Sequence, residues 1–416
     1  MSPGSGKRWT DIYPEVGTGP VAIDRLMSPE FYELEREKIF RTCWLCVGEM
    51  IDLPEPGDFL VKDLAVCSTS ILAVRGHDGT VRAFHNMCSH RGNKLAWDRR
   101  GRCSGGTLTC KFHGWCYDAA GRLVAVPGRE KFVDLRLEDN GLTPVATEVW
   151  ENFIFVNLSP RPRWTLREYL GGIVDDLKGF PFARLPHAFG YRIDLKCNWK
   201  IAVDAQNEGY HAAFLHKRTI GDIFSSADDP YVDPLDIKIY GLHQRASLPG
   251  YPPSRKPVRE IANEFGKRWS MSRTDDRLGA PDPHDVRFAD YESMPPGLNP
   301  TRAANWTFDI YMIFPNFWLG LSNGAYNTHQ WWPLGYDRTI QEVNMHQLLP
   351  RTAGERFSWE YNKTINRDVW LEDFSTLENT WQVMRSGAKH HFNLQDGEFM
   401  VRNFYRAVNE MAEARG

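Results

Sequence analysis

The first half of the chain consists of short apolar runs separated by turn residues. Between residues 44 and 160, β-branched and aromatic residues recur in runs bounded by Gly, Pro, Asn and Asp, a pattern typical of β-strands joined by tight turns. We therefore expect a small all-β domain that presents its functional residues on loops. The clearest strands are expected at residues 70–74, 81–85, 123–126 and 154–158.

The pattern changes after the Pro-rich segment 159–163. Apolar residues then recur at the helical period in some segments and alternate with polar residues in others. Helices are expected at residues 166–177, 198–216 and 356–384, strands at 188–195, 306–314, 318–321, 329–333 and 341–349, and a loop-rich region at 227–299. The second half should form a separate domain that mixes helices and strands.

The composition excludes several classes of protein. The 416 residues suffice for two domains, and a net charge of −3 with dispersed Lys and Arg argues against a nucleic-acid partner. No stretch approaches the roughly 18 apolar residues of a membrane-spanning helix, and the N-terminus lacks the apolar core of a signal peptide. We expect no membrane insertion, a cytoplasmic location, and free thiols for most of the eight cysteines.

Two pairs of cysteine and histidine carry the clearest chemistry. Cys88-Ser-His90 is followed, after nineteen intervening residues, by Cys110-Lys-Phe-His113. Two thiolates and two imidazoles are the ligands of a Rieske [2Fe–2S] cluster, in which the cysteines hold one iron and the histidines hold the other. The four residues are predicted to bind such a cluster, each pair at the tip of a hairpin, and to transfer electrons.

Three other interpretations are weaker. Zinc binds the same residue types, but zinc fingers usually pair Cys with Cys and His with His, whereas each pair here contains one of each. A respiratory Rieske carrier would have two further cysteines at the positions of Asn93 and Phe112. Cys43 and Cys46 have the spacing of a redox motif, yet they lie in an apolar run and are interpreted as buried core.

A second metal site is expected downstream of these pairs. His211 and His216 are five residues apart, so on an ideal helix they are separated by roughly 140° and can share an ion only if the helix widens or ends between them. Asp373, in the predicted C-terminal helix, supplies a carboxylate. Two histidines and one carboxylate form the facial triad of non-haem Fe(II) oxygenases, which leaves positions open for O₂. The spacing alone is a weak signal, and the Rieske motif strengthens it.

With these motifs the chain resembles the α (catalytic) subunit of bacterial Rieske non-haem iron ring-hydroxylating oxygenases. The resemblance covers most of the chain and includes residues 31–40 and 53–58, both Cys/His pairs, Asn198-Trp-Lys200 and Gly397-Glu-Phe399. It implies an α+β protein with an N-terminal all-β Rieske domain and a C-terminal helix-grip (START-like) catalytic domain built on an antiparallel sheet. The implied division is an N-terminal segment, residues 1–40, that packs on the catalytic domain, a Rieske [2Fe–2S] domain at 41–160, and a catalytic mononuclear iron domain at 161–416.

The resemblance also implies roles for individual residues. His211, His216 and Asp373 fall on the Fe(II) ligands of the family. Glu208 falls on the bridging carboxylate, which would connect His211 to His113 of the neighbouring subunit, either in a homotrimer (α3) or in an α3β3 assembly with a small β subunit.

Two departures from the family pattern surround the bridging position. Most members have Asp where this chain has Glu208, and the longer side chain resembles some quaternary-ammonium oxygenases. The usual Glu-Asn pair before the bridge reads Asp204-Ala205 here, which removes an amide near the iron.

The implied function is that of the terminal oxygenase of a multicomponent system. Electrons from NAD(P)H would arrive through a flavin reductase, a ferredoxin or both, and O₂ would be used to hydroxylate or cis-dihydroxylate an aromatic or related hydrophobic substrate, as in aromatic hydrocarbon catabolism. The alternative is a monooxygenase that performs O- or N-demethylation or quaternary-ammonium oxidation. The substrate pocket is expected to be lined by Asn207, Phe214, Leu215, Phe308 and Phe317, with Trp306, Trp318 and Trp331 as further candidates.

Overall fold

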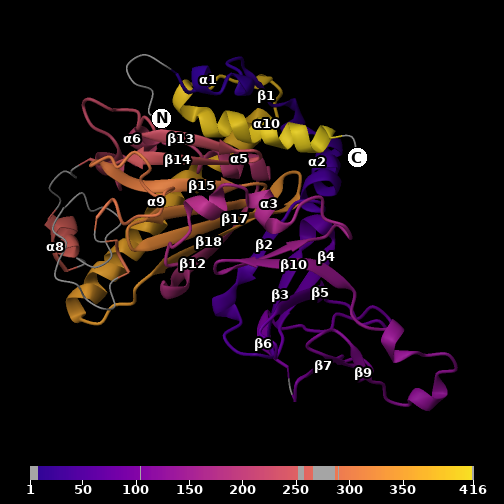
Figure 1. The fold of residues 1–416 in the computed structure, drawn as a ribbon. Helices are drawn as coiled ribbons and strands as arrows, with labels where there is room; N and C mark the ends of the chain where they lie inside the picture. The colour runs from indigo at the N-terminus through magenta and orange to yellow at the C-terminus, as the bar shows by residue number, and fades with distance from the viewer. Residues whose placement is uncertain (1–7, 104, 252–256, 266–285, 289, 415–416) are drawn as a thin grey trace. The chain divides into compact units, whose positions relative to one another are not determined.

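The computed structural model describes residues 8–103, 105–251, 257–265, 286–288 and 290–414 (Figure 1). The chain divides into two compact units. One unit contains residues 36–169, and the other contains the residues up to Glu35 together with those from Leu170 onward. Within the described residues, no helix combines the length and the apolar character that a bilayer span requires.

The unit of residues 36–169 is built on a seven-stranded antiparallel sheet. Residues that alternate along its strands, such as Phe59 and Val61 or Leu72 and Val74, face one buried core. The strand order is β2 (Leu45–Glu49), β11 (Phe153–Asn157), β10 (Pro144–Trp150), β5 (Val81–His85), β4 (Thr69–Arg75), β3 (Asp58–Leu64) and β6 (Arg100–Arg102), and a smaller sheet contains β7 (Thr107–Thr109), β8 (Cys116–Asp118) and β9 (Leu123–Ala125). The four strands expected in this region correspond to β4, β5, β9 and β11.

The second unit is also built on a seven-stranded antiparallel sheet. Its strand order is β12 (His187–Leu195), β18 (Arg338–Gln347), β17 (Ala325–Gly335), β16 (Phe317–Ser322), β15 (Trp306–Ile313), β14 (His243–Pro249) and β13 (Asp236–Tyr240). The helix α5 (Trp199–Asp204) packs against β17 and β18, α9 (Ala353–Met384) against β12, and α10 (Phe399–Glu413) against β14. This mixture of helices with an antiparallel sheet, following an all-β domain, confirms the predicted α+β fold class.

The remaining α-helices in the described part of the chain are short. They are α1 (Trp9–Ile12), α2 (Pro29–Glu35), α3 (Leu166–Leu170), α4 (Ile173–Asp176), α6 (Ala212–Leu215), α7 (Gly221–Phe224) and α8 (Pro257–Phe265). A π-helical turn, Arg36–Phe40, follows α2. Two two-residue strands, β1 (Val21–Ala22) and β19 (His391–Phe392), pair with each other, so the N-terminal segment and the C-terminal region of this unit lie side by side.

Three expectations about local structure are wrong. Residues 166–177 do not form one helix but the two short helices α3 and α4, and residues 198–216 likewise form the two short helices α5 and α6. The loop-rich region expected at 227–299 contains β13, β14 and α8, while its residues 252–256, 266–285 and 289 lie outside the described part of the chain. The polar strand β14 resembles a loop in sequence because its charge is compensated only in the fold, where buried Arg245 forms an ion pair with Asp236 on β13. The helix α10 was not anticipated.

The long helix α9 begins at a capping box. The Thr352 hydroxyl accepts a hydrogen bond from the Glu355 backbone N–H at 3.1 Å, and the Glu355 carboxylate accepts one from the Thr352 N–H at 3.3 Å. This reciprocal pair satisfies two backbone donors that a helix start leaves free. It therefore defines the start of the helix that carries Asp373.

A buried ion pair connects α2 to α5. The Lys200 ammonium donates to the Glu35 carboxylate, and their side chains are 2% and 0% exposed. The other Glu35 oxygen accepts a hydrogen bond from the Trp199 indole N–H at 2.9 Å. Burial lowers the pKa of Lys200, so the ammonium depends on its carboxylate partner.

Replacing Glu35 with Ala should therefore destabilise the protein strongly. A buried charge left without its partner costs about 3–5 kcal/mol, and the free energy of unfolding can be measured by urea denaturation. The matched control is R338A, which breaks the Arg338–Asp194 pair whose side chains are 56% and 46% exposed and should cost under about 1 kcal/mol. Equal losses in the two variants would contradict a structural role for the buried pair.

Candidate functional site

The two Cys/His pairs lie on loops of the unit of residues 36–169. The second pair occupies the connection between the paired strands β7 and β8, so it lies at a hairpin tip as expected. The first pair follows β5 and precedes β6, strands that are not neighbours in the sheet, so its loop is not a hairpin tip.

The two loops have the same local construction. In each, a glycine four residues after the cysteine donates its N–H to the cysteine carbonyl: Gly92 to Cys88 at 3.0 Å and Gly114 to Cys110 at 2.9 Å. Both glycines have a positive φ, +73° and +75°, which side chains with a Cβ rarely adopt. The glycines turn each loop back, so that the cysteine and histidine of one pair face those of the other.

The four side chains come together in space. The imidazoles of His90 and His113 have ring centroids 4.6 Å apart, and the thiols of Cys88 and Cys110 interact directly. None of the eight cysteines, all of which the structure describes, forms a disulfide, so these two thiols are available to a metal. The buried Nδ1 of His90 has no hydrogen-bond partner among the described residues, which fits a ring nitrogen reserved for a ligand bond.

The surroundings of these side chains hold them in place. Trp115 stacks on His90 with a centroid distance of 4.9 Å and an interplanar angle of 6°. The hydroxyl of Tyr117 lies 3.3 Å from the Cys88 sulfur and accepts a hydrogen bond from the Ser89 backbone N–H at 3.0 Å. Contacts of this kind to the sulfurs of an iron–sulfur centre raise its reduction potential.

A second group of metal-ligating side chains lies in the other unit. His211 immediately precedes the one-turn helix α6, and His216 immediately follows it. The helix thus begins and ends between the two histidines, as their five-residue spacing requires. The third member, Asp373, lies on α9, 157 residues further along the chain than His216.

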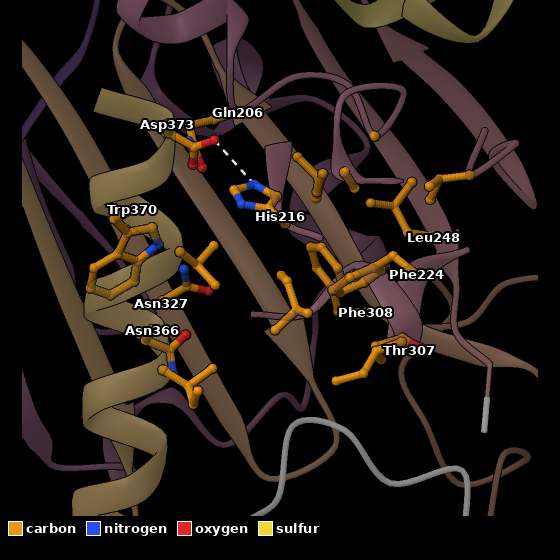
Figure 2. Close-up of a pocket in the computed structure, with 18 of the residues that line it drawn as sticks. Gln206, His216, Phe224, Leu248, Thr307, Phe308, Asn327, Asn366, Trp370 and Asp373 are labelled. Atoms are coloured by element: carbon orange, nitrogen blue, oxygen red, sulfur yellow. Dashed lines mark hydrogen bonds and ion pairs between the residues drawn. The ribbon is translucent and has the colours of Figure 1, made fainter. Parts of the chain in front are cut away.

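The ligand atoms of this group converge. The two Nε2 atoms are 3.1 Å apart, and the Asp373 Oδ1 lies 3.4 Å from the Nε2 of His211. The same Oδ1 lies 3.1 Å from the Nε2 of His216, and Figure 2 marks this contact with a dashed line. Atoms that bind one ion at about 2.1 Å and at right angles are roughly 3 Å apart. The three atoms therefore fit one face of an octahedral metal ion.

Two carboxylates orient the histidines. Glu208 contacts the Nδ1 of His211 and also accepts a hydrogen bond from its backbone N–H at 3.1 Å. The Nδ1–H of His216 donates to Glu372 at 2.9 Å, and the Thr219 hydroxyl donates to the same oxygen at 2.7 Å. Because Nδ1 is engaged in both rings, the Nε2 lone pairs are left for the metal.

The charge state of Asp373 suits a ligand. Burial acts to raise its pKa, but the imidazoles of His211 and His216 hold the pKa at about 2. Its second oxygen accepts a hydrogen bond from the side-chain amide of Gln206 at 2.9 Å. The group is therefore an ionised carboxylate with one oxygen held by the protein and the other directed at the histidines.

Sequence reasoning missed Glu372 and Gln206. Glu372 directly precedes Asp373, and Gln206 lies two residues before Glu208, so both stand beside residues that were singled out. Although the sequence lacks the family's amide at Asp204-Ala205, the neighbouring Gln206 places an amide against Asp373. In the sequence, the one sign of their role is that each stands next to a predicted site residue. Only the fold shows which of the neighbouring side chains contact the metal ligands.

A cavity of about 170 Å³ opens beside these three ligands. Its lining is mostly apolar, with a few amide and hydroxyl groups and one arginine. Side chains of α6, α7, β14, β15, β16, β17, α8 and α9 and of the segments between them contribute to it. They include Gln206, Ile220, Ile223, Phe224, Leu248, Arg259, Phe308, Ile310, Trp318, Asn327, Tyr361, Asn366, Val369 and Trp370.

The expected pocket residues are only partly in this lining. Phe308 and the further candidate Trp318 line the cavity. The other four, Asn207, Phe214, Leu215 and Phe317, are not among its lining residues. Phe214 is 69% exposed, and Phe317 is buried in β16 at 2% exposure. Aromatic and apolar residues near a ligand in sequence can point to either side of their element, and these four do not line the cavity.

Comparisons with known protein families agree with the geometry. A model described as the catalytic domain of the ring-hydroxylating α subunit matches residues 182–414, and a model described as the Rieske [2Fe–2S] domain matches residues 43–146.

Curated relatives include two kinds of oxygenase. The glycine betaine monooxygenase oxygenase subunit of Chromohalobacter salexigens is 28% identical over 82% of this chain and 73% of that protein. The carnitine monooxygenase oxygenase subunit of Acinetobacter baumannii is 30% identical over 45% of this chain and 50% of that protein. The biphenyl 2,3-dioxygenase α subunit of Rhodococcus jostii is 34% identical over 44% of this chain and 40% of that protein. The last two matches thus span half of the relative or less.

Solved structures share the fold. A quaternary ammonium Rieske monooxygenase superposes with a TM-score of 0.73 at 17% identity, covering 99% of this chain and 100% of that chain. Naphthalene 1,2-dioxygenase from a Rhodococcus species superposes with a TM-score of 0.69 at 21% identity, covering 95% of each chain.

Replacing Asp373 with Ala should remove one metal ion and leave the other centre intact. Loss of the carboxylate leaves two histidines to hold the ion, so metal analysis should find one iron fewer per chain than in the unmodified protein. The visible absorption of the [2Fe–2S] centre, which belongs to other residues, should be unchanged.

The control for this variant is D368A. Asp368 lies on the same helix, but its side chain is 40% exposed and pairs with Arg367. Its iron content should match that of the unmodified protein. Loss of the cluster absorption together with the mononuclear iron in D373A would mean that the two sites are not separate.

Proposed function

We propose that this chain, which belongs to the family of ring-hydroxylating oxygenase α subunits, is the terminal Rieske oxygenase of a multicomponent system. The substrate that we propose is a methylated ammonium compound. The single observation that carries the proposal is the convergence of His211, His216 and Asp373 beside an aromatic-lined cavity in a chain that also contains a Rieske domain. We assign the [2Fe–2S] cluster to Cys88, His90, Cys110 and His113, and Fe(II) to His211, His216 and Asp373.

Bound there, Fe(II) would supply the position at which O₂ is activated, and the Rieske cluster would supply stored electrons received from a reductase or ferredoxin. The protein's contribution is to orient the ligands and to shape the surroundings. Glu208 and Glu372 hold the two imidazoles with Nε2 inward. Apolar side chains such as Phe224 and Phe308 line the cavity beside the ligands and offer water no hydrogen-bond partner there.

The substrate class is argued from two observations. The glycine betaine and carnitine monooxygenase relatives are named for quaternary ammonium substrates, and one of them aligns over most of this chain. The cavity offers the aromatic rings of Trp318, Trp370 and Tyr361, and ring faces attract cations. Together they favour the alternative of the sequence analysis over its main expectation of aromatic hydroxylation.

Aromatic hydroxylation is the second candidate function. The biphenyl dioxygenase relative and the mostly apolar lining of the cavity support it. The two candidates differ in the fate of O₂. N-demethylation places one oxygen atom in a methyl C–H bond, releases the other as water and then loses the carbon as formaldehyde, whereas cis-dihydroxylation places both atoms in the product.

We expect the product to identify the reaction. The full-length protein, supplied with a reductase, NADH and ¹⁸O₂, should cleave a C–N bond of an N-methylated ammonium compound, detected as the shortened amine by mass spectrometry. Naphthalene and biphenyl should remain unchanged. An aromatic product carrying two ¹⁸O atoms, with no amine cleavage, would contradict the proposal, and D373A is the control for turnover at this site.

Glu208 is further proposed to connect His211 with His113 of a neighbouring subunit in a trimer. Its contact to the Nδ1 of His211 supports this role. In E208Q the electron transfer from the reduced cluster should slow by at least tenfold, because loss of a carboxylate that holds a metal histidine typically costs 10–100-fold.

The measurement is a single-turnover experiment that follows reoxidation of the cluster by its visible absorption. Cluster content and Fe(II) content of E208Q must equal those of the unmodified protein. An unchanged reoxidation rate with both metals present would contradict the bridging role.

A further inference from the structure

Asn327 is a buried polar residue in the wall of a mostly apolar cavity. It lies on β17, is 5% exposed and lines the cavity beside the metal ligands. Figure 2 shows Asn327 and Trp370 on one side of the cavity and Phe224, Phe308 and Leu248 on the opposite side. The wall that contains Asn327 therefore offers a polar amide to the cavity, whereas Phe224, Phe308 and Leu248 on the opposite side are apolar.

The register of the sheet places the neighbours of Asn327. On the paired strand β16, Gly320 lies opposite Asn327 and Trp318 opposite His329. Because side chains two residues apart on a strand share a face, Asn327 and His329 point the same way. A Cβ at Gly320 would lie 2.3 Å from the amide oxygen of Asn327, so the glycine leaves the space that this oxygen occupies.

His329 determines which atom of the amide faces the cavity. Its Nε2 lies 3.1 Å from the Asn327 amide nitrogen, and its Nδ1 lies 3.1 Å from that of Gln341. Burial lowers the pKa of His329 to about 3, so the ring is neutral, with one donor and one acceptor nitrogen. One of the two amides must therefore present its oxygen to the ring.

The structure places the nitrogen of the Asn327 amide against Nε2 of His329, so this ring nitrogen is the acceptor and Nδ1 carries the proton. The Nδ1–H needs an acceptor, and the Gln341 amide provides one when its oxygen, which has no other hydrogen-bond partner within the described part of the chain, is turned toward the ring. The Nε2 of His329 then accepts from the Asn327 nitrogen, which leaves the Asn327 oxygen as the amide atom free for an occupant of the cavity.

The same wall carries two tryptophans close to the metal ligands. The ring centroid of His329 lies 4.7 Å from that of Trp318 and 5.6 Å from that of Trp370. Trp318 donates its indole N–H to the Gln206 carbonyl at 2.9 Å, and the side chain of Gln206 reaches Asp373. Trp370 lies one helical turn before Asp373 on α9. Trp318 is therefore connected to the ligand Asp373 through the single residue Gln206, and Trp370 lies on the same helix as Asp373.

We propose that the oxygen of Asn327, fixed by His329 and Gln341, forms with Trp318 and Trp370 the wall that recognises the ammonium group of the substrate. This inference rests on the proposed function. The negative end of a carbonyl dipole and the faces of two indoles all attract a cation, whereas a quaternary ammonium offers no N–H to donate. Asn327 would then be a specificity-determining residue, and His329 and Gln341 would be positioning residues.

The test compares a cation with its uncharged isostere. Choline and 3,3-dimethyl-1-butanol have the same shape, and only choline carries the charge. The binding of each to the full-length iron-loaded protein can be measured by calorimetry. The unmodified protein should bind choline at least about tenfold more tightly, since desolvated cation–aromatic contacts alone supply about that preference.

Variants at position 327 separate charge recognition from shape. N327L removes the oxygen at similar volume and should weaken choline binding about tenfold while changing the binding of the alcohol less than about twofold. N327D keeps an oxygen and adds charge, so it should bind choline at least as tightly as the unmodified protein. Gln341→Leu should reproduce part of the N327L effect. Without the Gln341 oxygen, the proton of His329 is no longer held on Nδ1, and the His329 ring no longer fixes the orientation of the Asn327 amide.

The matched control is N366L. Asn366 also lines the cavity, but its amide nitrogen donates to the Asn362 backbone carbonyl at 2.8 Å and has no contact with His329. The ratio of choline to alcohol affinity should be unchanged in this variant. Equal losses for both probes in N327L, or a preference for choline that N327L leaves intact, would overturn the inference.

Failure of this inference can be told from failure of the proposed function. If the unmodified protein cleaves N-methylated ammonium compounds but N327L retains the full preference for choline, only the role of Asn327 is wrong. If the unmodified protein shows neither cleavage nor a preference for choline, both proposals fall.

Discussion

The two hydrogen bonds from histidine Nδ1 to a carboxylate are the interactions on which the rest of the site depends. Glu208 engages His211 and Glu372 engages His216, which fixes the ring orientation that a metal requires. Without them each ring could turn about its Cβ–Cγ bond, and the Nε2 atoms would no longer converge on the Oδ1 of Asp373. The one-turn helix α6 provides the backbone for this arrangement, because it begins and ends between the two histidines.

The fold concentrates the remaining functional groups on few elements. The helix α9 carries Glu372 and Asp373 and, one turn earlier, Trp370, so metal ligation, ligand orientation and a cavity wall share one rigid element. The facing strands β16 and β17 supply Trp318 and Asn327 in a register that brings them to the same cavity. A site built on elements of this kind is positioned more accurately than one built on loops.

Local patterns in the sequence predicted the all-β character of the first domain, five strands of the second and the long helix that carries Asp373, whereas the antiparallel arrangement of the second sheet was implied only by the family resemblance. The Cys/His pairs were visible because their ligands and turn glycines are close in sequence. The contacts of Gln206 and Glu372 were not, since whether a polar side chain reaches a ligand depends on packing between segments far apart in the chain. The strand β14 resembles a loop in sequence because its buried Arg245 is compensated by Asp236 only once the sheet has formed. Phe214 and Phe317, which are expected in the pocket, are not among the lining residues of the cavity, because an aromatic residue does not reveal from the sequence which side of its element faces the cavity.

The central claim is that one iron is held by two inward-facing Nε2 atoms and one carboxylate oxygen. It is tested most directly by a crystal structure of the iron-loaded protein, with anomalous data collected at the iron absorption edge. A single anomalous peak should lie about 2.0–2.2 Å from the Nε2 atoms of His211 and His216 and from the Oδ1 of Asp373. A peak bound through the Nδ1 atoms, or no peak among these three residues in fully loaded protein, would contradict the claim.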